Sequence, residues 1–337
     1  MDPVTALEEI GFWLERERAS TYKVEAFRRA GAVLADHDDV AGLAREGRLR
    51  SLDGIGARTA EVVEQALSGD VPDYLADLRR RGAGPLVEGG ETVRGAVRGD
   101  LHTHTDASDG GSSLETMART AERLGHEYLA ITDHSPSLTV AGGLSADRLV
   151  VQLEHVAELD ATLEGTRLLT GIEADILTDG TLDQEPRLLE RLDVVVASVH
   201  SKLRADSIAM TRRMLKAVRD PHTDILGHCT GRLVEGARGR RAESTFDAKR
   251  VFAACAEHAV AVEINARPER RDPPDRLIRL ALEAGCLFSI DSDAHAPGQL
   301  DFLDHGCARA ADLGVPLDRI VNTWPVDRLL QWTHRTR

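Results

Sequence analysis

Aromatic residues, cysteines and lysines are all scarce in this chain of 337 residues. Aromatic side chains make up only 4% of the sequence against 42% hydrophobic residues, so the core must be mainly aliphatic. No two of the four cysteines form a CxxC pair; they are Cys229, Cys255, Cys286 and Cys307. This spacing argues against a thiolate zinc site or a disulfide framework, and it favours small buried thiols in a reducing compartment.

No long apolar run is present either, and the first residues, MDPVTALEEI, are acidic. We therefore expect no signal peptide and no membrane span, and a cytoplasmic protein. The formal net charge is −14, and the only lysines are Lys23, Lys202, Lys216 and Lys249. Because so acidic a surface repels nucleic acid on average, any contact with DNA must be local or assisted by metal ions.

The pattern of the sequence divides the chain into three parts. Apolar residues recur at helical spacing up to residue 81, which predicts a small all-α domain over 1–81. Residues 82–98 are rich in glycine and have no clear period, which is typical of a linker. Over 99–337, short β-branched runs alternate with amphipathic stretches, so we expect parallel strands joined by crossover helices.

Seven strands are expected in the second region. They are Asp100–His104, Tyr128–Thr132, Leu168–Glu173, Val194–Val199, Asp224–Gly227, Val260–Asn265 and Leu287–Asp291. Seven strand–helix units in about 240 residues predict an α/β fold, a distorted (β/α)7 barrel. In such a barrel the loops at the carboxyl ends of the strands carry the chemistry.

Metal-binding residue types stand at the carboxyl ends of nearly all these strands. They are His102, His104, Asp109, His134, Glu173, His200, His228, Asp293 and His295. One histidine at a strand end is ordinary, and the seven other histidines of the chain have no such placement. Six at corresponding ends have no explanation in packing. Imidazoles and carboxylates without thiolates suit zinc, manganese or iron, and nine groups are too many for one ion, so we expect two or three divalent metals.

Several of these segments resemble the motifs of the PHP (polymerase and histidinol phosphatase) superfamily. The motifs are LHTHTDASDG, ITDHS, GIEADIL, ASVHS, LGHCTGR, EINARPERRD and IDSDAH, and the resemblance covers residues 99–337. It is closest to the C-terminal PHP domain of bacterial family X DNA polymerases. It implies a trinuclear metal centre and phosphoesterase activity.

The resemblance also implies how the ligands are shared. One metal would take His102, His104, Glu173 and Asp293; a second would share Glu173 and add His200 and His228; the third would take Asp109, His134 and His295. A metal lowers the pKa of bound water enough to give hydroxide near neutral pH, so a metal-bridged hydroxide is the expected nucleophile.

Other polar residues near these ends are candidates for substrate binding or support. Arg232 and Arg267 are candidates for holding a substrate phosphate, although a structural salt bridge or a solvated side chain explains either equally well. Asn265 would orient substrate or satisfy backbone at its strand end. Asp133 is a candidate partner for a ligand histidine. Arg238, Arg240 and Arg241 lie in a stretch that we interpret mainly as a solvated loop, with phosphate contact as the alternative.

The first region contains LDGIGARTAEVVEQAL, which has the pattern of a helix-hairpin-helix. Gly54, Ile55, Gly56 and Arg58 would form a turn whose backbone N–H groups receive a DNA phosphate, and a plain helix-loop-helix core is the alternative. The surrounding sequence resembles the small N-terminal domain of the same polymerases. Val62 stands where some relatives carry a nucleophilic lysine, so lyase activity is not expected. Seventeen residues between the two regions leave no room for a polymerase palm, so we expect no polymerase activity.

Three functions remain open from the sequence. The first is a metal-dependent phosphodiesterase that processes DNA ends in DNA repair, for example a 3′–5′ exonuclease, with DNA as partner. The second is a small-molecule phosphomonoesterase such as a histidinol phosphatase, which the acidic charge favours and the hairpin region disfavours. The third is a non-catalytic DNA-binding protein, against which the complete set of nine ligands argues.

Overall fold

The computed structural model describes residues 1–236 and 239–335 and separates them into two compact units. The first covers Met1–Leu86 and the second begins at Val87. In the described ranges no helix is both long and apolar enough to cross a membrane. All four cysteines are buried as free thiols.

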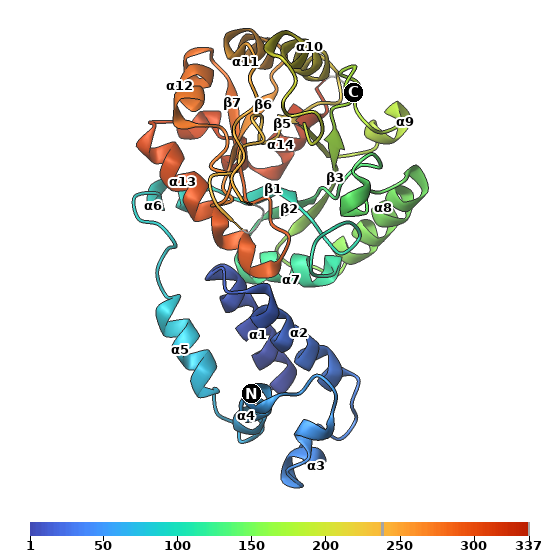
Figure 1. Cartoon of the computed structure of the whole chain (residues 1–337), viewed down its shortest axis with the longest axis vertical. Coiled ribbons are helices and arrows are strands. Elements are labelled where there is room, and N and C mark those ends of the chain that lie inside the picture. Colours follow the sequence, from blue (N-terminus) through green and yellow to red (C-terminus); the bar gives the residue numbers. More distant parts are fainter. Residues whose placement is uncertain (237–238, 336–337) are drawn as a thin grey trace. The chain divides into compact units, whose positions relative to one another are not determined.

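The first unit is entirely helical (Figure 1). Its helices are α1 (Pro3–Arg16), α2 (Thr21–Ala35), α3 (Val40–Arg45), α4 (Ala57–Leu67) and α5 (Asp73–Arg81), with a 3₁₀ turn at Leu49–Ser51. Leu7, Ile10, Phe27 and Val63 lie among the side chains that form its core. The helical spacing read from the sequence thus buries one apolar face of each of these helices.

The second unit is built on a seven-stranded, wholly parallel sheet in the order β1 to β7. The strands are β1 (Gly99–Thr103), β2 (Tyr128–Ile131), β3 (Arg167–Asp175), β4 (Val194–Ser198), β5 (Ile225–Leu226), β6 (Ala261–Asn265) and β7 (Leu287–Asp291). An isolated parallel bridge, Thr103 to Ala294, joins the two edges. The sheet therefore curls into a nearly closed barrel, which confirms the predicted fold class.

Helices follow most strands and cover the barrel (Figure 1). They are α6 (Glu91–Ala96), α7 (Leu114–Arg123), α8 (Ala146–Asp160), α9 (Pro186–Leu189), α10 (Ser207–Val218), α11 (Ala248–Glu257), α12 (Asp275–Glu283), α13 (Leu303–Asp312) and α14 (Val326–Thr333). Short 3₁₀ turns lie at Thr139–Ala141, Pro297–Phe302, Leu317–Arg319 and Val321–Thr323. The segment expected to be a linker, 82–98, contains α6, and Arg94 of this helix forms an ion pair with Asp304 of α13 at 3.4 Å.

The amino end of the barrel is plugged by the C-terminal segment. Trp324 and Trp332 pack edge to face and join one apolar cluster with Leu169 and Val196 of the strands. The Tyr128 hydroxyl donates to the carbonyl of Asn322 at 2.8 Å. Because side chains on a strand alternate, apolar residues fill this end and polar residues occupy the carboxyl end.

Candidate metal centre

All nine residues singled out at the strand ends come together at the carboxyl end of the barrel. Their ligand atoms form four overlapping groups, and within each group every ligand atom lies within 4.8 Å of the others. The groups are His102, His104 and Asp293; His102, Glu173 and His228; His134, Glu173 and His200; and His104, Asp109, His134 and His295. The allocation of these ligands to individual ions stays a prediction.

Glu173 lies at the middle of this cluster. Its carboxylate is 2.8 Å from His228 Nε2, 2.9 Å from His134 Nδ1, 3.2 Å from His200 Nε2 and 3.3 Å from His102 Nε2. Burial alone raises the pKa of Glu173, but the charges of His200, His102 and His134 outweigh it and hold the pKa well below its usual value. Strand β3 thus places an ionised carboxylate at the centre of the cluster, where its negative charge attracts cations.

The cluster is more open on the side of Asp109. Asp109 Oδ1 lies 3.3 Å from His134 Nε2 and 3.4 Å from His295 Nε2. The side chains of Asp109 and His295 are 37% and 19% exposed, and His200 is 13% exposed, whereas Glu173 is 1% exposed. The cluster is therefore most accessible to solvent from the side of Asp109, His295 and His200.

The donor set fits bound cations. Several buried ligand atoms have no hydrogen-bond partner among the described residues: His102 Nε2, both ring nitrogens of His104 and of His228, His134 Nδ1, His200 Nε2 and both carboxylate oxygens of Glu173. Leaving buried polar atoms unsatisfied costs about 1–3 kcal/mol each, so their convergence requires an occupant. Imidazole nitrogens and carboxylate oxygens are ligands for zinc, manganese or iron.

A second layer of carboxylates orients the ligand histidines. Glu263 Oε1 lies 2.6 Å from His102 Nδ1, and its other oxygen accepts from the backbone N–H of His228. Asp175 Oδ1 accepts from the backbone N–H of His200 at 3.0 Å and lies 3.1 Å from its Nδ1. Such contacts fix the ring orientation and raise ligand basicity. The sequence analysis missed both residues, although each stands two positions from a singled-out residue on the same strand.

Asp133 plays a different part from the expected one. Its carboxylate accepts hydrogen bonds from Thr105 N–H at 2.9 Å, Thr105 Oγ1 at 2.7 Å, Ser108 Oγ and Gln152 Nε2, and none of these donors is a ligand histidine. The prediction that Asp133 orients a ligand histidine is therefore wrong. Asp133 instead fixes the β1–α7 loop, which carries His104 and Asp109.

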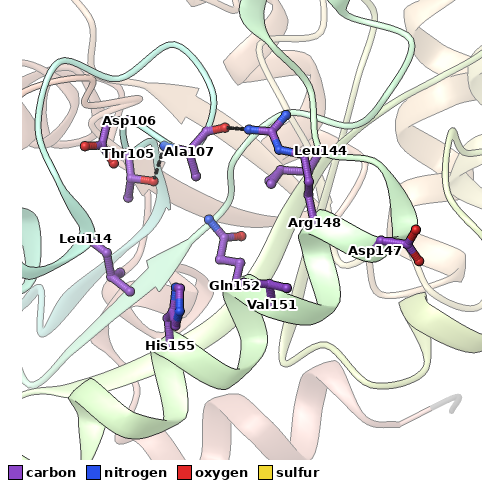
Figure 2. A pocket seen from close by; sticks show the side chains of 10 residues that line it. All are labelled: Thr105, Asp106, Ala107, Leu114, Leu144, Asp147, Arg148, Val151, Gln152 and His155. Carbon is purple, nitrogen blue, oxygen red and sulfur yellow. Dashed lines mark hydrogen bonds between the residues drawn. The ribbon is translucent and has the colours of Figure 1, made fainter.

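Helix α8 holds the same loop from behind, as Figure 2 shows. Arg148 donates to the carbonyl of Ala107 and, at 2.7 Å, to that of Gly142. A cavity of about 370 Å³ separates α8 from the loop, and Leu114, Val151 and His155 are among its lining residues. Polar anchors on α8 thus span this cavity and set the position of the Asp109 loop.

The residues proposed to bind substrate are largely engaged with the protein itself. Arg232 donates through Nε to the carbonyls of Arg270 and Arg271, at 3.2 and 3.0 Å. Asn265 Nδ2 donates to Glu263 at 3.2 Å and to Asp293 at 3.1 Å. These contacts favour a supporting role for both side chains. A substrate contact stays a prediction.

Two arginines lie against the ligand Asp293. Arg267 Nη1 donates to the carbonyl of Asp293 at 3.1 Å and lies 2.8 Å from His295 Nδ1. Arg270, which the sequence analysis did not single out, is buried and donates through Nε to Asp293 Oδ2 at 2.8 Å. Of the two, Arg267 lies beside the more exposed His295, so it is the better placed to meet a phosphate.

The arginine-rich loop is only partly described. Arg238 lies outside the described residues. Arg240 is exposed, and Arg241 donates through Nε to the carbonyl of Gly231 at 2.5 Å. This bond gives Arg241 a structural task.

The first unit has a tight turn at Gly54–Gly56 directly before α4, and binding of a DNA phosphate by this turn stays a prediction. Gly54 takes a left-handed backbone with φ of 94°, Ile55 is buried, and the N–H of Gly56 donates to Thr59 Oγ1 at 2.9 Å. Val62 is also buried, in the helical core, so this position offers no nucleophile.

A cavity of about 400 Å³ adjoins this turn, and Gly54, Gly56, Arg58, Tyr22 and Lys23 are among its lining residues. Arg58 and Lys23 lie 5.5 and 5.3 Å from the centre of the Tyr74 ring. Lys23 was missed by the sequence analysis. Its signal was its rarity, since it is one of four lysines.

Comparison with known proteins agrees with this geometry. Residues 100–267 match the PHP domain family, and residues 1–70 match a helix-hairpin-helix domain family. A Bacillus subtilis protein named DNA polymerase/3′-5′ exonuclease PolX is 39% identical over 216 residues, which are 64% of this chain and 37% of that protein. The chain thus spans little more than a third of that relative.

Other relatives are similar over nearly their whole length. A protein of Caldanaerobacter subterraneus named probable phosphatase is 28% identical over 251 residues, 71% of this chain and 91% of that protein. A solved histidinol phosphate phosphatase of Lactococcus lactis, complexed with zinc, histidinol and phosphate, matches with a TM-score of 0.46 and 19% identity, over 64% of this chain and 92% of that chain. From its barrel, its ligand cluster and the two matching domain families, this chain belongs to the PHP family of phosphoesterases and carries a helix-hairpin-helix domain ahead of its barrel.

Proposed function

We propose that this protein is a metal-dependent phosphodiesterase that shortens DNA from its 3′ ends. The observation that carries the proposal is the joining, in one chain, of the nine-residue cluster around Glu173 and the helix-hairpin-helix turn at Gly54–Gly56. The similarity to the Bacillus protein named as a 3′-5′ exonuclease supports it. In this proposal the active site consists of the nine residues of the metal centre.

Two or three divalent ions would be held by these ligands, with Glu173 shared between groups. When bound, they would polarise the phosphoryl oxygens and supply hydroxide from water near neutral pH. The chain's own contribution is to hold the ligands in place: Glu263 fixes the ring of His102, Asp175 fixes that of His200, and Arg267 lies beside His295. Arg267 also adds a fixed positive charge where phosphoryl charge gathers.

The hairpin turn of the helical unit would bind the DNA backbone. Helix α4 begins at Ala57, so its first N–H groups face the end where Arg58 and Lys23 supply positive charge. This is the local contact that a chain of net charge −14 requires. We also infer that the protein adds no nucleotides, because no segment between the helical unit and the barrel has room for a polymerase palm.

The test is hydrolysis, with manganese, of end-labelled single-stranded and recessed DNA beside histidinol phosphate and a generic phosphate ester. Glu173→Ala is the inactive variant, and Glu158→Ala, an exposed carboxylate on α8, is the matched control. Stepwise shortening from the 3′ end that disappears only in Glu173→Ala supports the proposal. Intact DNA together with rapid turnover of histidinol phosphate would overturn it.

A second candidate, a small-molecule phosphomonoesterase, has its own support. Relatives named probable phosphatase align over about nine tenths of their length, and the acidic surface suits a small substrate better than DNA. The hairpin turn has no task in that reading, which is why we place it second. A purely non-catalytic DNA-binding role would leave the ligand cluster without a purpose.

A further inference from the structure

Basic side chains gather on one side of the barrel although the chain as a whole is acidic. Residues 201–220 contain six lysines and arginines against two aspartates. Two of the four lysines, Lys202 and Lys216, belong to this segment, and a third, Lys249, lies in the first turn of α11. A local excess of this kind in a chain of net charge −14 is a place where a polyanion can dock.

Arg212, Lys216 and Arg219 line a groove between α10 and α11, which are neighbouring helices in Figure 1. The groove has a volume of about 840 Å³. Arg212 and Lys216 lie on α10, and Arg219 caps its carboxyl end. With spacings of four and three residues, the three share one exposed face over about 10 Å. Arg250 of α11 adds a further cation.

The cations of the groove are largely unneutralised. Arg212, Arg219 and Arg250 form no side-chain ion pair with any residue in the described ranges. Lys216 meets Asp179 at 3.4 Å in a solvent-exposed pair, which contributes little. Of the two acidic residues in the lining, Asp247 caps α11 by accepting from the N–H of Arg250, and Asp220 accepts from the N–H of His222 at 3.0 Å.

The groove begins on the side of the metal centre. His200 follows β4, and the loop after it carries Lys202 and Arg204 into the start of α10 at Ser207. The buried Arg213 of α10 ties this loop to the helix by donating to the carbonyls of Ser201 at 2.7 Å and Ile176 at 2.8 Å. In a barrel of this kind helices start at the carboxyl end of the strands, so the basic face leads away from the ligand cluster.

We propose that the groove between α10 and α11 binds the phosphate backbone of a single DNA strand and guides that strand at the metal centre. The inference rests on the proposed nuclease function and names the path of its substrate. Grooves that bind single strands combine a basic track with contacts to the bases. Ile208, 84% exposed at the start of α10, offers such an apolar contact.

The test compares the wild type with Arg212→Ala/Lys216→Ala/Arg219→Ala in the full-length, metal-loaded protein. The matched control is Arg123→Ala/Arg191→Ala/Arg279→Ala, which removes the same charge from three exposed arginines elsewhere on the barrel. Binding of a phosphorothioate oligothymidylate is measured by anisotropy over a salt series. Hydrolysis of nitrophenyl phosphate reports on the metal centre alone.

We expect the groove variant to lose about tenfold to a hundredfold in affinity at low salt and to lower the slope of log affinity against log salt by about 2, three contacts at 0.7 each. Its nitrophenyl phosphate turnover should match that of the wild type and the control. Equal affinity and equal salt slope in the groove and control variants would overturn the proposal that the groove binds DNA. A wild type that binds the oligonucleotide through the groove but never shortens DNA would instead overturn the nuclease function and leave the groove standing.

Discussion

Glu263 is not counted among the ligands, but it contacts two ligand residues and so positions them. It holds the ring of His102 and the backbone of His228. We expect Glu263→Gln to weaken metal affinity about tenfold to a hundredfold, because the amide orients the His102 ring less firmly and leaves it less basic.

Chelator competition followed by elemental analysis measures that loss. Glu257→Gln, on an exposed position of α11, is the control with the same change of charge. If both variants retain metal as the wild type does, Glu263 has no positioning role.

His126 gives the fold a sensitivity to acid that is separate from the metal ligands. Its ring is buried, neither nitrogen has a hydrogen-bond partner in the described ranges, and burial together with the charge of Arg94 lowers its pKa to about 3. The unfolded chain, with a pKa near 6.5, therefore binds a proton between pH 6.5 and 3 that the folded chain does not. The resulting stability is present above about pH 6.5 and is lost as the pH falls.

We expect the free energy of unfolding of the wild type to drop by about 2 kcal/mol more than that of His126→Leu between pH 7 and pH 5. Urea unfolding of both metal-free proteins at the two pH values measures the difference. Parallel pH profiles in wild type and variant would show that the ring is not held neutral.

Sequence patterns reveal ligands more readily than their supports. The ligand residues were recognisable because histidines and carboxylates recur at the ends of successive strands. Glu263 and Arg270 gave no such signal, because each matters through a partner far away in the chain, His102 or Asp293. Asp133 was assigned to the wrong partner for the same reason: adjacency to His134 in sequence does not fix where its side chain points.

Among the elements, the hairpin turn uses its two glycines for different reasons: one for its backbone conformation and the other for the open space beside it. Gly54 has a positive φ, and a Cβ there would lie 3.0 Å from the Arg29 side chain, whereas Gly56 has an ordinary φ of −91° and open space around it. Gly54→Ala should cost about 1–3 kcal/mol of stability. Gly56→Ala should leave stability nearly unchanged and weaken DNA binding, because its methyl group occupies the space at the start of α4 that a phosphate would approach.

Thermal unfolding measures the stability of both variants, and fluorescence anisotropy measures their affinity for DNA. Unchanged DNA affinity in a fully folded Gly56→Ala protein would remove the turn from the DNA-binding surface.

The periodic elements of the barrel were predictable, and the short ones were not. Runs such as Val194–Ser198 and Leu287–Asp291 are buried on both faces, so their β-branched and aliphatic composition announces them. The fifth strand is only Ile225–Leu226, shorter than the predicted Asp224–Gly227, because only these two residues pair with both β4 and β6. Helix α6 was not predicted, because its six residues lie beside glycines and are too few to show a helical period. Its packing on α13 stabilises it.

For the whole barrel, the metal centre ties the first strand to the last. His102 lies in β1 and His104 directly follows it, while Asp293 and His295 follow β7. The edge between these two strands carries an isolated bridge between Thr103 and Ala294. Removing the ions should lower the melting temperature of the barrel by about 10 °C, the shift expected for a ligand worth about 4 kcal/mol.

Calorimetry before and after chelation tests this, with the transition of the helical unit, which contains none of the ligands, as an internal reference. Identical barrel transitions in both samples would mean that the ligand cluster is stable without cations.

The rarity of lysine turns these surfaces into natural reporters. Lys23 lies at the hairpin cavity, Lys216 in the barrel groove, and Lys202 and Lys249 on the segments that border it. An amine-acylating reagent therefore has, besides the terminal amine, only four targets, and each adjoins a surface to which we assign DNA. Peptide mass mapping of acylation with and without an oligonucleotide would read both surfaces in one experiment on the unaltered protein, and protection at Lys23 alone would place the strand on the hairpin and not on the barrel.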